Sequence, residues 1–203
     1  MLSKLRKGFT IIELMMVVAI ISILLGIVVN VAQSSIKEAR RHKASTVCTL
    51  VEQAFATYYA QYGKWPAPLG SMATSGSFGT ENEYVLSRSE ADTMVREVIR
   101  EIKNGNPLMN ISGLYVSTNN GEPRQERCPR HNGNVIRYYP AKGAIGMDFI
   151  EALRGTKQHP KKIKVSQMHF GYPHVHTGQF MPFRVVYNVQ ADTVSVEQWH
   201  WCD

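Results

Sequence analysis

The sequence lacks the motifs on which enzyme chemistry usually depends. Its 203 residues contain no nucleophile–base pairing, no phosphate-binding loop and no pair of carboxylates at a catalytic spacing. Because catalysis needs such groups within reach of one another, the sequence gives no basis for predicting an enzyme, and it predicts no cofactor.

Cysteine is scarce, and proline and glycine are missing from one long stretch. The three cysteines are Cys48, Cys128 and Cys202, and no proline or glycine lies between Asn30 and Tyr62. Nothing in that stretch would therefore break a helix. Cys48 lies among apolar neighbours there and is predicted to be a small buried residue. Apolar residues recur at spacings of three and four, which predicts a buried helical face: Val47, Leu50, Val51, Ala54, Phe55, Tyr58, Tyr59 and Tyr62.

The longest apolar run comes before this stretch. A basic head of Lys4, Arg6 and Lys7 ends at Gly8, and the run covers residues 9–29. It would form a helix of about 31 Å, enough to cross a bilayer core of about 30 Å. Because positive charge favours the cytoplasmic side, the head predicts a cytoplasmic start and an exported remainder. Four positions in the run are small or polar: Thr10, Glu13, Ser22 and Gly26.

Glu13 is the informative exception in this run. A carboxylate at the bilayer centre costs on the order of 2.5–3.5 kcal/mol, and less near an edge, so an acid here suggests a function. Glu13 lies four residues after Phe9, about 6 Å along the helix and on the same face. If the chain were cut between Gly8 and Phe9, the new α-amino group would lie near the depth of this carboxylate. The two groups could then pair between neighbouring copies and set the register between subunits.

The string Lys-Gly-Phe-Thr-Ile-Ile-Glu-Leu at residues 7–14 resembles the cleavage and methylation motif of type IV prepilins and type II secretion pseudopilins. The resemblance is close over residues 1–30 and looser as far as about residue 66. It implies that a membrane prepilin peptidase cleaves after Gly8 and methylates the amine of Phe9. It also implies that Glu13 docks each subunit onto its neighbour in a filament.

Two simpler interpretations compete with this resemblance. An ordinary secretory signal peptide would have a small-residue cleavage site after its apolar run, but no Ala-x-Ala-like site follows, and the run is longer than usual. The other interpretation is a plain membrane anchor in which Glu13 is incidental.

Pattern and resemblance together predict an α+β protein with the pilin fold. Residues 1–8 would be a leader peptide, and residues 9–62 one long helix with a transmembrane half at 9–29. Residues 63–203 would form a periplasmic domain, of ordinary domain size, with a C-terminal antiparallel sheet. Loss of the leader would lower the formal charge from +7 to +4, too little to indicate nucleic acid as a partner.

The junction after the long helix carries two further expectations. Gly63-Lys64-Trp65-Pro66 is typical of a helix end. The passage at residues 58–66 is also similar to the Tyr…Gly-x-aromatic-Pro passage of major pseudopilins, which favours the secretion branch. Residues 67–82 predict an exposed loop. Asn30 departs from the pattern, because many pilins have a helix-kinking proline at this position.

The rest of the domain predicts one helix and several short strands. Ser87 and Glu90 have capping-box spacing before a helix that would end at Asn104, with a solvated face of charged pairs. Residues 113–117 and 135–139 are strand-like, and residues 147–153 predict a short helix ending at Gly155. Strands at 183–189 and 193–199 would flank a turn at 190–192. The helix's apolar face would contain Met94, Val95, Val98, Ile99 and Ile102, and its pairs would be Asp92/Arg96 and Glu97/Arg100.

Four groups of residues are weaker candidates for chemistry. Many pilins have a C-terminal disulfide loop, and the resemblance makes Cys128 and Cys202 the candidates here, although sequence does not give the Cα separation. His169, His174 and His176 could hold a metal if they lay on a strand, but Gly171 and Pro173 favour a loop and a structural role. Some pseudopilins bind calcium through an acidic C-terminal loop, which is not expected here. The basic run at 157–164, beside Trp199 and Trp201, is interpreted as a solvated strand edge rather than a nucleic-acid site.

The sequence thus predicts a structural subunit that polymerises with other pilins or pseudopilins. Its expected partners are a prepilin peptidase, an inner-membrane assembly platform and membrane lipid. The preferred hypothesis places it in the pseudopilus of a type II secretion system. The alternatives are a surface type IV pilus subunit for adhesion, motility or DNA uptake, and a membrane-anchored ligand- or metal-binding domain.

Overall fold

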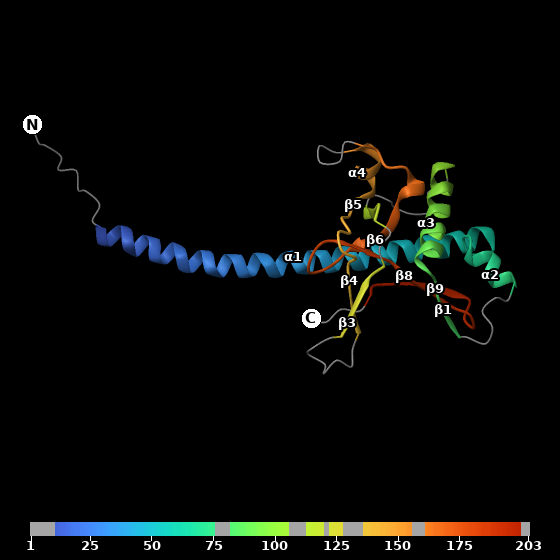
Figure 1. The fold of residues 1–203 in the computed structure, drawn as a ribbon, viewed down its shortest axis with the longest axis horizontal. Coiled ribbons are helices and arrows are strands. Elements are labelled where there is room, and N and C mark those ends of the chain that lie inside the picture. The colour runs from blue at the N-terminus through green and yellow to red at the C-terminus, as the bar shows by residue number, and fades with distance from the viewer. Residues whose placement is uncertain are drawn as a thin grey trace, which may run out of the picture. The chain divides into compact units, whose positions relative to one another are not determined.

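The computed structural model describes residues 11–75, 82–105, 113–119, 122–127, 136–155 and 161–199. It has the predicted α+β architecture, in which a long N-terminal helix packs through its second half on a domain of antiparallel sheets (Figure 1). The chain divides into two compact units, Met1–Ala39 and Arg40–Asp203.

In the first unit the structure describes residues 11–39, which form the first half of helix α1. The whole helix runs from Ile11 to Tyr62. Every described side chain before Ala39 is exposed, although most are apolar. Three polar side chains bond within the helix, because Ser22, Asn30 and Ser35 each donate to the carbonyl four residues earlier. Asn30 therefore continues the helix. By length and composition α1 could cross a membrane.

The second half of α1 buries one face in the domain, as its spacing predicts. Leu50 and Tyr59 are partly buried, whereas Tyr62 is exposed, contrary to the prediction, because it lies on the helix's last turn and its hydroxyl bonds Glu101 on the surface. Gly63 has φ 67 and donates to the carbonyl of Tyr59, which ends the helix. The buried residues of α1 are Ala44, Val47, Cys48, Val51, Ala54, Phe55 and Tyr58.

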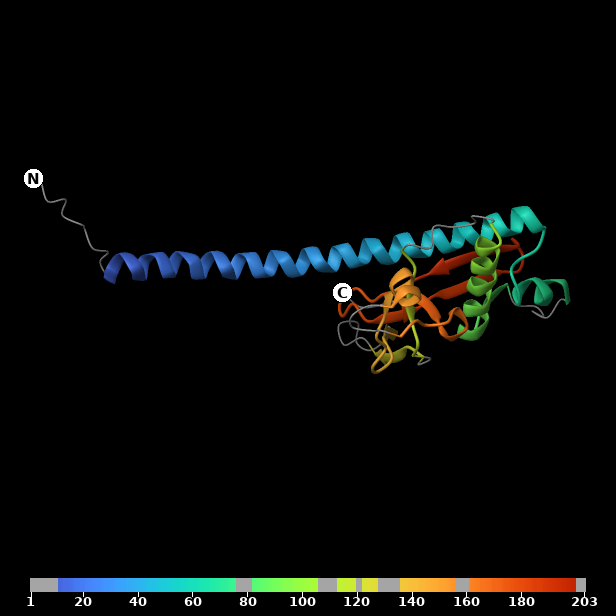
Figure 2. The same cartoon turned by 90° about the horizontal axis from the view of Figure 1, so that it is seen from above.

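The described strands form three antiparallel sheets with the orders β1-β8-β9, β5-β2-β6-β7 and β3-β4. Val185 pairs with Val196 and Tyr187 with Val194, so all four side chains share the face that enters the core. Figure 2 shows β8 and β9 alongside the second half of α1. The strands are β1 Glu83–Val85, β2 Tyr115–Ser117, β3 Arg124–Arg127, β4 Ile136–Tyr139, β5 Met147–Asp148, β6 His169–Pro173, β7 Phe180–Pro182, β8 Arg184–Asn188 and β9 Thr193–Glu197.

Helix α3, Arg88–Lys103, begins and ends as predicted. Ser87 and Glu90 form the capping box, and Asn104 is the C-cap. Four of the five predicted face residues are buried in the core, and Ile102 is partly buried against it. The predicted short helix is present as α4, Phe149–Arg154, capped by Asp148 and ended by Gly155, although its first two residues form β5 instead.

Two loop predictions are wrong. Residues 67–82 contain helix α2, Leu69–Ser75, because Leu69 is fully buried in the core and fixes this segment on the domain. The segment around Gly171 and Pro173 is strand β6 rather than a loop. A Cβ on Gly171 would lie 1.8 Å from the carbonyl oxygen of Met181, so the glycine permits close pairing with β7, and Pro173 is the last residue of the strand.

Candidate functional site

The exposed half of α1 is the first candidate site, because an apolar surface of this length needs a partner. Residues Ile11–Val31 present large apolar side chains with exposed fractions of 44–80%. Glu13 is the acidic residue of the first turn of α1, where the helix dipole favours negative charge. Gly8 and Phe9, the predicted cleavage and methylation positions, lie outside the described residues.

The predicted thiol site is described only in part. Cys48 is buried and free, as expected. Burial, and then the charge of Glu52, raise the pKa of its thiol to about 12, so it is chemically inert near neutral pH. Cys128 and Cys202 lie outside the described residues, and their pairing stays a hypothesis.

Two of the three histidines, His174 and His176, lie close together, whereas His169 contacts Asp92. Nδ1 of His169 lies 2.6 Å from Oδ2 of Asp92. His174 is fully buried, with Nδ1 3.0 Å from the hydroxyl of Thr177, and its ring centroid is 5.7 Å from that of His176. Within the described ranges no group of three or more His, Cys, Asp or Glu side chains could hold a metal ion.

Asp92 does not lie on a solvated face, contrary to the prediction. It is 3% exposed, and its Oδ1 accepts a hydrogen bond from the backbone N–H of Phe170 at 2.8 Å. Arg96, its predicted partner, instead donates to the carbonyl of Met168. The carboxylate thus provides a hydrogen-bond acceptor for the backbone N–H of Phe170 at the start of β6, and this bond connects α3 to that strand. The predicted pair of Glu97 and Arg100 is present on the surface.

The predicted basic strand edge is also not found. Residues 157–160 lie outside the described part, and residues 161–164 belong to no strand but precede the short 3-10 helix η3, Val165–Gln167. Trp199 does not form an exposed site together with this basic run. It packs against the core, and its indole donates to the carbonyl of Pro182. Trp201 lies outside the described residues.

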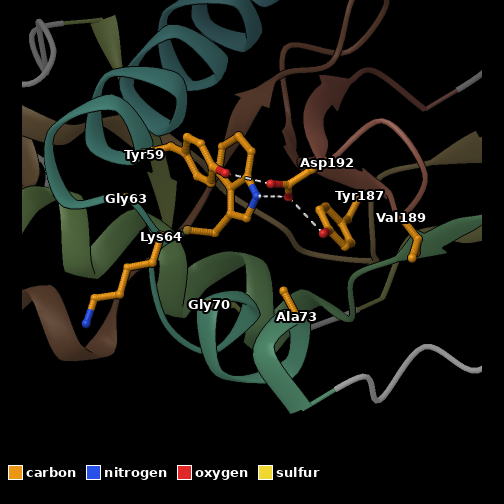
Figure 3. Close-up of a pocket in the computed structure, with 9 residues that line it drawn as sticks. Tyr59, Gly63, Lys64, Gly70, Ala73, Tyr187, Val189 and Asp192 are labelled. Carbon is orange, nitrogen blue, oxygen red and sulfur yellow. Dashed lines mark hydrogen bonds between the residues drawn. The ribbon is translucent and has the colours of Figure 1, made fainter.

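A polar cluster that the sequence did not predict lies where α1 ends. The carboxylate of Asp192, in the β8–β9 turn, accepts from the Tyr59 hydroxyl at 2.6 Å, the Trp65 indole at 2.7 Å and the Tyr187 hydroxyl at 2.9 Å. We call these four residues the Asp192 clasp (Figure 3). Although partial burial alone would raise it, the three hydrogen bonds lower the pKa of Asp192. Burial, followed by the bond to Asp192, raises the pKa of Tyr187 to about 12.

The clasp joins three parts of the chain, namely the end of α1, the residues after it and the C-terminal hairpin. It also lines a pocket of about 360 Å³. Asp192 has φ 49, in the left-handed region that aspartate and asparagine tolerate better than most residues. No sequence signal indicated the clasp, because two of its donors lie 133 and 127 residues from their acceptor.

A long helix with an exposed apolar first half, packed through its second half on antiparallel sheets, defines a pilin-like subunit. The prokaryotic N-terminal methylation motif matches residues 3–29. A type IV major pilin protein PilE1 of Neisseria gonorrhoeae is 37% identical over 137 residues, which are 66% of this chain and 75% of that pilin. The chain therefore belongs to the type IV pilin family.

Other relatives agree with this assignment. A fimbrial protein of Neisseria meningitidis serogroup B is 28% identical over 135 residues, 66% of this chain and 72% of that protein. The fimbrial protein EcpC of Eikenella corrodens is 38% identical over 88 residues, 43% of this chain and 56% of that protein. No solved structure matches the chain.

These matches do not support the secretion-specific prediction. The relatives are named as pilins and fimbrial proteins, whereas the passage at residues 58–66 had favoured a pseudopilin. In the structure this passage ends α1 at Gly63 and buries Trp65 against Asp192. The passage therefore reflects how α1 ends and how its end packs on the domain. These features do not distinguish pseudopilins from type IV pilins.

Proposed function

We propose that this protein is a structural subunit of a type IV pilus. The observation that carries the proposal is the exposed apolar half of α1 in a chain that is 37% identical to a type IV major pilin over 137 residues. Before assembly this surface would lie in the lipid of the inner membrane, and after assembly it would pack against the same surface of other subunits. The alternative predicted from the sequence thus fits better than the secretion pseudopilus.

The proposal includes the processing that the sequence implies. A prepilin peptidase would cleave between Gly8 and Phe9 and methylate the amine of Phe9, with the globular domain on the periplasmic side. An inner-membrane assembly platform would then add the subunit to the filament. The relatives' names agree with the prediction that the chain is not an enzyme.

The test follows the subunit from membrane to filament. Filaments sheared from the cell surface should contain the mature chain, and its mass should correspond to an N-methylated Phe9 start. Gly8→Leu, which places a bulky residue before the scissile bond, should leave the leader attached and keep the chain in the membrane fraction. A processed chain that stays in the periplasm and is absent from sheared filaments would favour the pseudopilus. A chain that begins at Met1 would favour the plain anchor.

A further inference from the structure

Among the described residues, the groups that donate hydrogen bonds to the negative charge of the Asp192 clasp are neutral. Its three donors are two hydroxyls and one indole N–H. No described lysine, arginine or histidine forms an ion pair with Asp192. Neutral donors stabilise a carboxylate but do not cancel its charge, so the clasp remains an anionic site.

The surroundings of this carboxylate add to its preference for positive charge. The C-terminal end of α1, the negative end of the helix dipole, closes at Gly63 beside it, and the last turn of α1 contains no basic residue. The rings of Tyr59 and Trp65 pack with centroids 4.4 Å apart, and with Tyr187 they supply aromatic walls. Aromatic faces attract cations.

The pocket beside the clasp has room for a ligand. It holds about 360 Å³ and is bordered by the small residues Gly70 and Ala73. Lys64 also lines it, but Figure 3 shows its side chain directed away from the Asp192 carboxylate. The carboxylate, the aromatic walls and the helix end therefore meet at a cavity in which no side chain of a described lining residue places a cation at Asp192.

We propose that this pocket binds an alkylammonium group, with the ammonium at Asp192 and the alkyl chain along the aromatic walls. A divalent metal fits less well, because it would need several oxygen ligands and the described residues of the pocket offer one carboxylate. The proposal goes beyond the pilus function and does not depend on it, since binding is measured on the unassembled subunit.

The experiment titrates the full chain in detergent micelles with n-butylammonium chloride, using n-butanol plus sodium chloride as the neutral counterpart. The indole N–H of Trp65 donates to Asp192, so its NMR signal, identified by its loss in Trp65→Phe, reports the site directly. We expect saturable binding in the millimolar range for n-butylammonium, and binding at least about tenfold weaker for n-butanol. Equal shifts with both compounds, or no shift with either, would overturn the proposal.

Two variants test the role of charge. Asp192→Asn keeps an acceptor oxygen and tolerates a positive φ, yet removes the charge, so it should abolish saturable binding while the Trp65 indole signal persists. Lys64→Glu leaves the clasp intact and makes the pocket rim more negative, so it should tighten binding about threefold at low salt. Unchanged affinity in Lys64→Glu would contradict an electrostatic site even if Asp192→Asn failed to fold.

Discussion

At the scale of single residues, burial decides what each polar side chain can do. His174 is the clearest case, because it is fully buried and its Nε2 has no hydrogen-bond partner among the described residues. Burial first, and then the positive charges of His176 and Arg40, lower its pKa from 6.5 to about 4. His174 is therefore neutral in the folded protein at any pH above about 4.

This shift predicts a loss of stability in acid. Between pH 6.5 and 4 the unfolded chain binds a proton at residue 174 and the folded chain does not, so the free energy of unfolding falls as the pH falls. Above this window both states are neutral, and below it both are protonated. From pH 7 to pH 5 the residue should account for a loss of roughly 2 kcal/mol. Denaturant unfolding of wild type and His174→Asn at both pH values measures it, and parallel losses in the two proteins would refute the assignment.

The roles of some residues can be predicted from the sequence, and the roles of others cannot. Glu13 is conspicuous because a carboxylate in an apolar run is costly, and that cost can be read without a structure. Asp192 is an ordinary turn residue in the sequence, since its donors Tyr59 and Trp65 come from a distant segment. Asp92 was misassigned for a related reason. Helical spacing gives its neighbours along α3, but not the backbone N–H of β6 that it satisfies.

At the scale of elements, local sequence signals predicted an element correctly where the residues that define it lie within the element or directly beside it. The capping box of α3, the glycine that ends α1 and the alternating hairpin strands β8 and β9 all form as predicted. Elements fixed by tertiary contacts were missed. Helix α2 has too few apolar residues to show a period and is placed by the burial of Leu69, and β6 contains a glycine and a proline that usually indicate a loop.

The glycine in β6 leads to a prediction about sheet pairing. Gly171→Ala would place a Cβ 1.8 Å from the backbone oxygen of Met181, and a backbone atom in a paired strand cannot move aside cheaply. We expect a loss of about 3 kcal/mol or more in the free energy of unfolding. Gly113→Ala is the matched control, because among the described residues its Cβ would meet only a methyl of Val47 at 3.9 Å, and it should change stability by less than about 1 kcal/mol. Similar effects of both substitutions would disprove the close-approach explanation.

At the scale of the whole molecule, the reactivity of the three thiols tests whether a disulfide between Cys128 and Cys202 attaches the C-terminal end of the chain to the domain. Cys48 is buried with its pKa raised to about 12, so an alkylating reagent should not modify the native protein if Cys128 and Cys202 are bridged. After denaturation without reductant one thiol should react, and after reduction three. A bridge that closes about 75 residues should stabilise the fold by roughly 4 kcal/mol in the chain-entropy model. Three reactive thiols in unreduced, denatured protein from the periplasmic side would exclude the bond.

The last prediction concerns how whole subunits join. In lipid, Glu13 would lie near the cytoplasmic edge of the bilayer, where water and headgroups reduce the cost of its charge. In a filament core it would lose this relief and need the α-amino group of a neighbour's Phe9. Removing one partner of a buried ion pair commonly costs about 3–5 kcal/mol, because the other charge stays buried and unpaired. Glu13→Val should therefore spare membrane insertion and leader cleavage but prevent efficient assembly.

The measurement compares leader cleavage, membrane fractionation and sheared filament yield in wild type, Glu13→Val and Glu38→Gln. Glu38 is an exposed acid on the same helix, beyond the apolar run, so its variant controls for the loss of any negative charge from α1. We expect normal filaments from Glu38→Gln and few or none from Glu13→Val, with both chains cleaved and inserted. Normal filaments from Glu13→Val would show that Glu13 does not set the register. A Glu13→Val chain missing from the membrane would instead place the role of this residue before assembly, because the added apolarity should favour insertion.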